Sequence, residues 1–308
     1  MLRRFFVAVA LGMVARVATV HAQDQSVLSD ANSLSLSPIY LSDTDQKPDF
    51  HGFVETQLKT AHITPRGLII ADHGVEIQPV GALTCDLFEG TGLIDKASVT
   101  AGVWNSVNTS LDDPSAGPWF EIDYFARLNL QVADRVNMTL QYIAFDSPGG
   151  AFSTDNNIEL TFSYDDTGFI AKDFAIRPYA RLFYNMSGSS TTLLGRNGNT
   201  YDVELGFVPA YLWRLCPSYP VTLSLPTYLT VGPSNFWGGT RDVGIFTTSL
   251  GASVPMSFIP ERFGRWHLDA SVAYFNLLNG KLVDAANTLG NGRDRNRVVG
   301  EIGMGFEF

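Results

Sequence analysis

The stretch Glu301-Ile302-Gly303-Met304-Gly305-Phe306-Glu307-Phe308 alternates strictly between two kinds of residue. One set holds large apolar residues: Ile302, Met304, Phe306 and Phe308. The other holds acids and glycines: Glu301, Gly303, Gly305 and Glu307. A period of two is typical of a β-strand whose two faces meet different surroundings. Large apolar residues on one face and polar or tiny residues on the other indicate a strand between lipid and a wet interior.

The same alternation recurs along the chain, between turns rich in Gly, Asn and Asp. It predicts twelve strands, near 54–71, 75–87, 97–107, 118–130, 135–145, 156–166, 172–185, 201–212, 219–231, 243–255, 265–276 and 296–308. Thr64-Pro65-Arg66-Gly67 interrupts the first of them. No stretch after the N-terminal segment shows sustained helical periodicity. We therefore predict an all-β fold, an antiparallel up-and-down β-barrel of about 12 strands over 51–308.

The N-terminal segment has the features of a secretory signal peptide, predicted for residues 1–22. Arg3 and Arg4 form a basic start, Phe5 to Val14 an apolar run, and Val20-His21-Ala22 a small-residue cleavage site. Arg16 breaks the apolar run, so it is too short to span a bilayer as a helix. Residues 23–50 are polar and predict a flexible N-terminal segment.

The terminal strand and the strand pattern together resemble the outer-membrane β-barrels of Gram-negative bacteria. In such proteins a final strand of this form, here through Glu301, Gly303, Phe306 and Phe308, is read by the barrel-assembly machinery. Arg66-Gly67-Leu68-Ile69-Ile70, followed by Val103-Trp104-Asn105-Ser106, also resembles a loose group of uncharacterised outer-membrane proteins. That resemblance implies an outer-membrane location and lipid as a partner, but no reaction and no substrate.

Charge and aromatic residues fit this interpretation. The formal net charge is −10, and removal of the signal peptide would make it more negative, which disfavours nucleic-acid binding. Aromatic residues at the ends of predicted strands fit the girdles at the two membrane interfaces. They are Trp119, Tyr142, Tyr164, Tyr184, Tyr201, Tyr211, Trp237 and Trp266. The predicted connections at one end are on average longer than those at the other, as in barrels with long extracellular loops.

The predicted inward face is rich in charge. Its candidate lumen-lining residues are Glu121, Asp123, Arg127, Glu159, Asp165, Arg177, Arg181, Asp202, Glu204, Asp269 and Glu301. Arg177 and Arg181 lie beside strands that carry acids, so cross-strand pairing is expected. Two interpretations follow. These charges line a cation-preferring pore, or they satisfy one another in a closed polar core.

Enzyme and metal chemistry have little support in the sequence. His267, Asp269 and Ser271 share one face of a strand, but a lipid hydrolase needs its Ser and His on the lipid-facing surface, and these three point inward. No cluster with metal-ligand spacing occurs, and no cofactor is predicted. Cys85 and Cys216 are both expected near the periplasmic rim, in a compartment where a disulfide can form. Their strands lie on roughly opposite walls, which favours two free thiols over a disulfide.

The sequence thus favours a monomeric outer-membrane barrel that acts as a passive, porin-like channel for small polar or cationic solutes. The alternative is a non-conducting structural or surface-display barrel whose function lies in its extracellular loops. A membrane-embedded lipid hydrolase comes third. Whether a loop such as 277–295 folds into the lumen stays open.

Overall fold

The computed structural model describes residues 50–90, 92–110, 117–187, 198–214, 219–238 and 242–308. These residues form a closed antiparallel barrel of twelve strands, so the predicted fold class is confirmed. The predicted signal peptide and all but the last residue of the predicted polar segment lie outside the described residues; that last residue, Phe50, begins β1. None of the helices in the described part of the chain is long and apolar enough to cross a bilayer.

Nine of the barrel strands are continuous: β1 (Phe50–Lys59), β4 (Glu76–Glu89), β5 (Ile94–Asn108), β6 (Trp119–Val132), β7 (Val136–Asp146), β8 (Asp155–Tyr164), β15 (Val243–Pro255), β16 (Arg265–Leu277) and β17 (Asn296–Glu307). The other three are each broken in two: β9 (Phe174–Ala175) with β10 (Pro178–Ser187), β11 (Thr200–Phe207) with β12 (Ala210–Trp213), and β13 (Val221–Ser224) with β14 (Thr227–Val231). Neighbours in sequence pair with each other, and β1 closes the ring by pairing with β17.

The three breaks have local causes. Arg177 adopts a left-handed conformation (φ 51°) between β9 and β10. Pro209 and Pro226 lie at the other two breaks, and a proline cannot donate to a strand ladder. The breaks lie in neighbouring strands and support one another, because the Leu225 amide donates to the Pro209 carbonyl at 2.9 Å. A backbone hydrogen bond thus joins the break between β11 and β12 to the break between β13 and β14.

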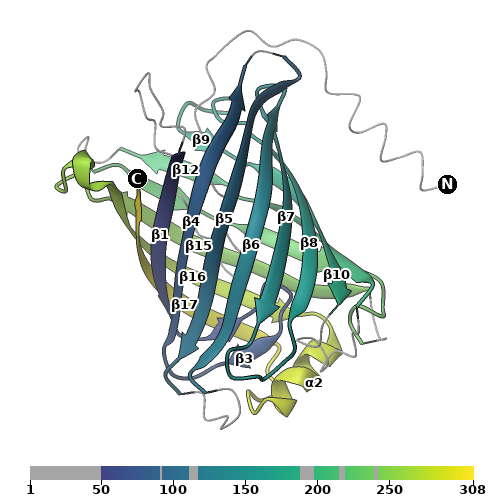
Figure 1. The fold of residues 1–308 in the computed structure, drawn as a ribbon. Coiled ribbons are helices and arrows are strands. Elements are labelled where there is room, and N and C mark those ends of the chain that lie inside the picture. Colours follow the sequence, from purple (N-terminus) through teal and green to yellow (C-terminus); the bar gives the residue numbers. More distant parts are fainter. Residues whose placement is uncertain (1–49, 91, 111–116, 188–197, 215–218, 239–241) are drawn as a thin grey trace.

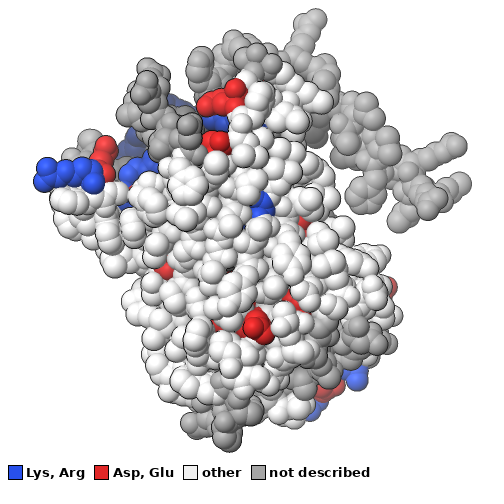
Figure 2. Space-filling view, viewed as in Figure 1, with Lys and Arg blue, Asp and Glu red and all other residues white. Residues whose placement is uncertain are grey.

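The alternation predicted for the last strand is present. Val298, Ile302 and Met304 of β17 are exposed on the outer surface, whereas Gly303 and Gly305 are buried. The wall seen in Figure 2 is mostly uncharged between its two ends, where charged side chains gather. An apolar belt of this kind suits contact with lipid acyl chains.

The first predicted strand, 54–71, is wrong in its second half. The barrel strand β1 ends at Lys59, and residues 60–75, here called the inner hairpin, turn into the barrel. The inner hairpin contains the short strands β2 (His62–Ile63) and β3 (Ile69–Ala71), which pair as a separate two-stranded sheet. The tip of this hairpin is the Thr64-Pro65-Arg66-Gly67 stretch that interrupts the predicted strand.

A helix also occurs where the sequence showed no helical periodicity. It is α2 (Gly280–Thr288), in the connection between β16 and β17, and a short 3-10 turn, η3 (Glu261–Phe263), precedes β16. Asn279 caps α2 by accepting a hydrogen bond from the Lys281 amide. β3 and α2 lie at the end of the barrel opposite the C-terminus (Figure 1). We call this the hairpin end, and the other the terminal end.

Candidate functional site

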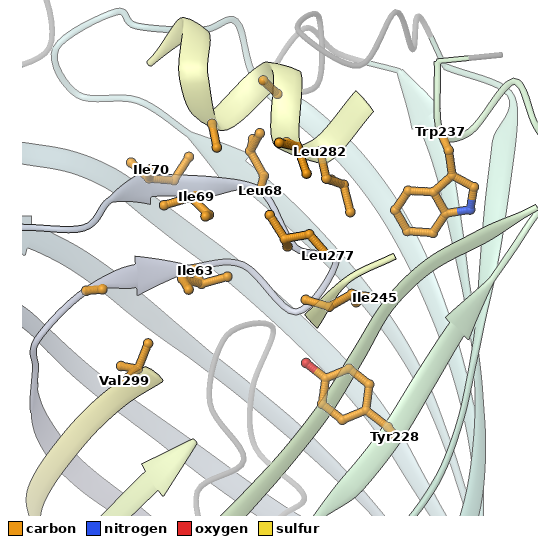
Figure 3. Packing of buried hydrophobic residues seen from close by; sticks show 14 of the residues in the cluster. Ile63, Leu68, Ile69, Ile70, Tyr228, Trp237, Ile245, Leu277, Leu282 and Val299 are labelled. Carbon is orange, nitrogen blue, oxygen red and sulfur yellow. The ribbon is translucent and has the colours of Figure 1, made fainter. Parts of the chain in front are cut away.

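The hairpin end of the barrel has an apolar core rather than an open mouth. Apolar side chains of the inner hairpin, of α2 and of the wall pack together there (Figure 3). Among them Ile69, Leu282 and Trp237 have no exposed surface. Trp237 therefore does not belong to an interfacial girdle as predicted, because it lies inside the core. The other seven aromatic residues of that prediction are partly or fully exposed.

The tip of the inner hairpin is a tight turn that presents one arginine. The Gly67 amide donates to the Thr64 carbonyl at 2.8 Å, and Gly67 has a φ of 84°, which glycine adopts without strain. The hydroxyl of Thr64 accepts a hydrogen bond from the Leu68 amide at 3.1 Å. These bonds fix the turn and direct Arg66 into the barrel.

Arg66 is held by three groups of the wall. Its Nη2 lies 2.6 Å from Oε1 of Glu159, and its Nε lies 3.3 Å from Oδ1 of Asp202. Its guanidinium carbon lies 3.3 Å from the centroid of the Phe183 ring. All four side chains are buried. Removing one partner of a buried ion pair typically costs about 3–5 kcal/mol, so Arg66 is a strong attachment of the hairpin to the wall.

Further contacts tie the other arm of the hairpin to the connection that carries α2 and to the start of β17. The Asn291 side-chain amide donates to the carbonyl oxygens of Ile69 and Ile70, at 3.0 and 3.2 Å. Asp72 accepts an ion-paired hydrogen bond from Arg297 of β17 at 2.8 Å. The inner hairpin is thus held at its tip, at its second arm and through its apolar side chains.

A buried Ser–His–Glu cluster lies at the base of the hairpin. Oγ of Ser106 lies 3.1 Å from Nδ1 of His62 and donates a short hydrogen bond to Glu76. Catalytic triads place the acid on one ring nitrogen and the nucleophile on the other. Here Glu76, at 3.6 Å, faces the same nitrogen as Ser106, and all three side chains lack exposed surface. The cluster anchors the hairpin and has no triad geometry.

The wall next to Arg66 carries an excess of acid. Glu121 and Asp123 lie two residues apart on β6, and both are buried on its inner face. Neither oxygen of Asp123 accepts a hydrogen bond from a donor group in the described residues. Among the residues that the structure describes, nine acids and four Lys or Arg side chains are buried. Acids therefore outnumber bases among the buried side chains that the structure describes.

Each predicted lumen-lining residue has a definite place. Seven of them are buried on the inner face of β6, β8, β10 and β11: Glu121, Asp123, Arg127, Glu159, Arg181, Asp202 and Glu204. Two are half-buried on β16 and β17, namely Asp269 and Glu301. The other two, Asp165 and Arg177, lie outside the strands. Asp165 instead shapes the turn after β8 by accepting a hydrogen bond from the Thr167 amide. Arg181 pairs with Glu204 across strands at 3.7 Å. The expected pairing of Arg177 with strand acids is absent among the described contacts, because Arg177 stands at the break before β10.

The exposed fraction of the inward-facing side chains shows how far the lumen is filled. Water filling a wide pore would leave the side chains of its wall accessible. Yet Glu121 is 6 % exposed, Arg127 5 % and Asn157 0 %. A second buried apolar cluster, centred on Trp104 and Phe125, adds to the filling. In this conformation the interior near the hairpin is packed with side chains.

The inward-facing His267, Asp269 and Ser271 do not form a hydrolase site in this structure. Nε2 of His267 lies 3.2 Å from Asp269, but no described hydrogen bond joins Ser271 to His267. Among the described residues, no group of three or more His, Cys, Asp or Glu side chains has metal-binding geometry. Cys85 has a free thiol, and Cys216 lies outside the described residues.

Comparisons with known proteins give structural likeness alone. No protein-family model and no curated protein matches the chain. Among solved structures, an outer membrane channel from Pseudomonas putida F1 is 11 % identical with a TM-score of 0.46, over 88 % of this chain and 100 % of that one. The transport unit of the autotransporter AIDA-I from Escherichia coli is 11 % identical (TM-score 0.42, 90 % and 95 %). Outer membrane phospholipase A from Escherichia coli is 14 % identical (TM-score 0.41, 84 % and 92 %).

Sequence reasoning missed Arg66, the central residue of this site. Arg66 lay in an interruption of a predicted strand, so nothing assigned it a partner. One signal was present: the predicted strand 54–71 is far longer than the 9–11 residues that a strand needs to cross a membrane. The excess length, with Pro65 and Gly67, marks a segment that leaves the wall.

Proposed function

We propose that the chain is an outer-membrane barrel that passes small polar or cationic solutes, and that its inner hairpin closes the lumen at rest. The observation that carries this proposal is the docking of Arg66 between Glu159 and Asp202. The positively charged tip of the hairpin is held by the negative charge of the surrounding buried acids. It occupies the place that a cationic solute would take. The packed interior means that the channel conducts when the hairpin moves.

The proposal includes a location and partners. An exported chain with a cleaved signal peptide at 1–22 would place the terminal end in the periplasm of a Gram-negative cell and the hairpin end outside. The apolar outer surface would meet outer-membrane lipid. The final strand, through Glu301, Gly303, Phe306 and Phe308, would be recognised by the barrel-assembly machinery. We propose a monomer.

A non-conducting barrel is the second candidate. The apolar core around Trp237 and Leu282 favours it, because such a core stabilises one closed conformation. In that case the surface at the hairpin end would carry the function. A lipid hydrolase is disfavoured, since His267 and Asp269 face the interior rather than the lipid. We therefore propose that the protein is not an enzyme.

Single-channel conductance in a planar bilayer tests the proposal. The refolded protein without residues 1–22 should give rare, brief openings, whereas Arg66→Ala should give longer openings with cation preference. Arg214→Ala is the matched control, because it removes an exposed arginine that pairs with Asp173. A folded Arg66→Ala barrel that stays silent at every voltage would overturn the channel and favour the non-conducting barrel.

A further inference from the structure

We infer that Glu159, Phe183 and Asp202 form a binding site for the guanidinium group of a diffusing solute, and that Arg66 is a tethered occupant of this site. The inference rests on the proposed function, because a solute must first enter the lumen. It adds a ligand class and a location to that function.

The three wall residues form one row across the sheet. Phe183 of β10 is the direct cross-strand partner of Glu159 on β8 and of Asp202 on β11. All three side chains are buried on the inner face. A flat aromatic face therefore lies between two carboxylates. The row belongs to the barrel wall, so it does not need the hairpin for its own arrangement.

Neighbouring side chains hold this row in place. The Phe183 ring stacks on Phe145 at 6.3 Å between centroids and meets Phe236 edge-on at 6.2 Å. The second carboxylate oxygen of Glu159 accepts a hydrogen bond from the Gln141 amide at 3.4 Å. A site that is fixed in advance spends less free energy on ordering when a ligand binds.

The geometry selects a guanidinium over a simple ammonium ion. Arg66 lies over the ring with one nitrogen on each carboxylate. A planar guanidinium combines this stacking with hydrogen bonds from its edge, whereas an ammonium ion is a compact and strongly hydrated point charge. The occupant seen in the structure therefore shows the chemistry that the wall prefers.

Arg66 and a guanidinium-bearing solute would compete for the same row of wall residues. Binding of the solute would therefore be coupled to opening of the channel. Arg66 is tethered, so its effective concentration at the site is on the order of millimolar. A solute that bears a guanidinium group and is present at comparable concentration displaces it and frees the tip of the hairpin. Arg66→Ala should remove this competition and leave the row available.

Ligand titration of the folded barrel without residues 1–22, in detergent, provides the test, with methylguanidinium as the probe. Methylguanidinium should bind saturably to Arg66→Ala and raise its unfolding temperature, at constant ionic strength. Methylammonium should bind at least about tenfold more weakly, since it cannot stack in the same way. Wild type should respond at higher concentrations than Arg66→Ala. Equal responses to both probes would overturn the inference.

Two double variants localise the binding. Arg66→Ala with Glu159→Gln should lose about tenfold or more in affinity, as expected for a lost charged hydrogen bond. Arg66→Ala with Asp269→Asn is the matched control, since Asp269 is a half-buried acid on the inner face of β16, a strand that does not neighbour the row, and its affinity should be unchanged. If Arg66→Ala fails to fold, Arg66→Gln serves as the parent. Equal affinity in the two double variants would place the probe elsewhere and refute the site.

Conductance separates this inference from the proposed function. Saturable binding by a barrel that never conducts would support the site and refute the channel. Conducting Arg66→Ala that does not bind methylguanidinium would support the channel and refute the site.

Discussion

Asn291 and Ile69 join two distant parts of the chain, because the Asn291 amide donates to the Ile69 carbonyl at 3.0 Å inside the barrel. Asn291→Ala would leave this carbonyl and that of Ile70 buried without their donor, at a cost of about 1–3 kcal/mol each. We expect the inner hairpin to open more often while the wall stays intact. Hydrogen–deuterium exchange should rise at 62–71 and stay unchanged in β5 and β6.

A control for that variant lies in the same connection. Arg293→Ala removes an exposed pair with Asp284 and should change the exchange of the hairpin by less than about threefold, because exposed pairs contribute little. If both variants raise the exchange equally, Asn291 is not the specific attachment.

Gly67→Ala should loosen the hairpin at its tip. A Cβ at Gly67 would meet Leu282 Cδ1 at 2.9 Å and Ile245 Cδ1 at 3.0 Å, at a φ of 84°. Backbone strain of this kind costs about 1–3 kcal/mol, and the close contacts add to it. Faster proteolysis within 60–75 would report the effect. Gly150→Ala is the matched control, because Gly150 also has a positive φ (78°) but nothing within 4 Å.

Arg181→Gln should destabilise the whole barrel. It would leave Glu204 buried without its cationic partner, which typically costs about 3–5 kcal/mol. Heat-modifiable gel mobility or denaturant unfolding in detergent would measure the loss. Arg214→Gln, at an exposed pair with Asp173, should cost less than about 1 kcal/mol. A loss no larger than that of the control would show that the Arg181 pair contributes little.

The attachment at the base of the hairpin should weaken in mild acid. Burial lowers the pKa of His62, so the folded protein keeps this side chain neutral below the usual value of about 6.5. The unfolded chain takes up a proton as the pH falls through that value. The contribution of His62 to stability is therefore present above pH 6.5 and declines below it. The fall in unfolding temperature from pH 7.5 to 5 should be smaller in His62→Gln. His73→Gln, at an exposed histidine, should behave like wild type.

The sequence predicts the wall well, because each strand separates lipid from the interior and so must alternate. That constraint alone predicts twelve strands and the inward positions of Glu159 and Asp202. It does not predict the breaks as breaks, since Pro209 falls in step with the apolar residues Leu205 and Phe207 of β11. The strands of the wall can be predicted because their pattern depends only on the alternation of neighbouring residues in the sequence.

The inner hairpin could not be derived in this way. Ile69 and Ile70 are apolar and β-branched, which fits a strand of the wall as well as a core. Their partners, such as Leu282 and Asn291, lie more than two hundred residues away, and no local rule connects them. The prediction for Trp237 is wrong for the same reason, because an aromatic residue at a strand end fits a lipid interface as well as an interior. Burial by distant segments decides between them.

The pairing of β1 with β17 has a consequence for the order of assembly. The inner hairpin directly follows β1, but its partners belong to β8, β11 and the connection before β17. A ring of strands stays open until its first and last members meet. The hairpin therefore need not thread through a finished ring, because its tip can dock on β8 and β11 while the seam is open. Closure at the seam then encloses it. A chain halted before β17 would hold the same hairpin on an open sheet, with two unpaired edges ready to capture another chain.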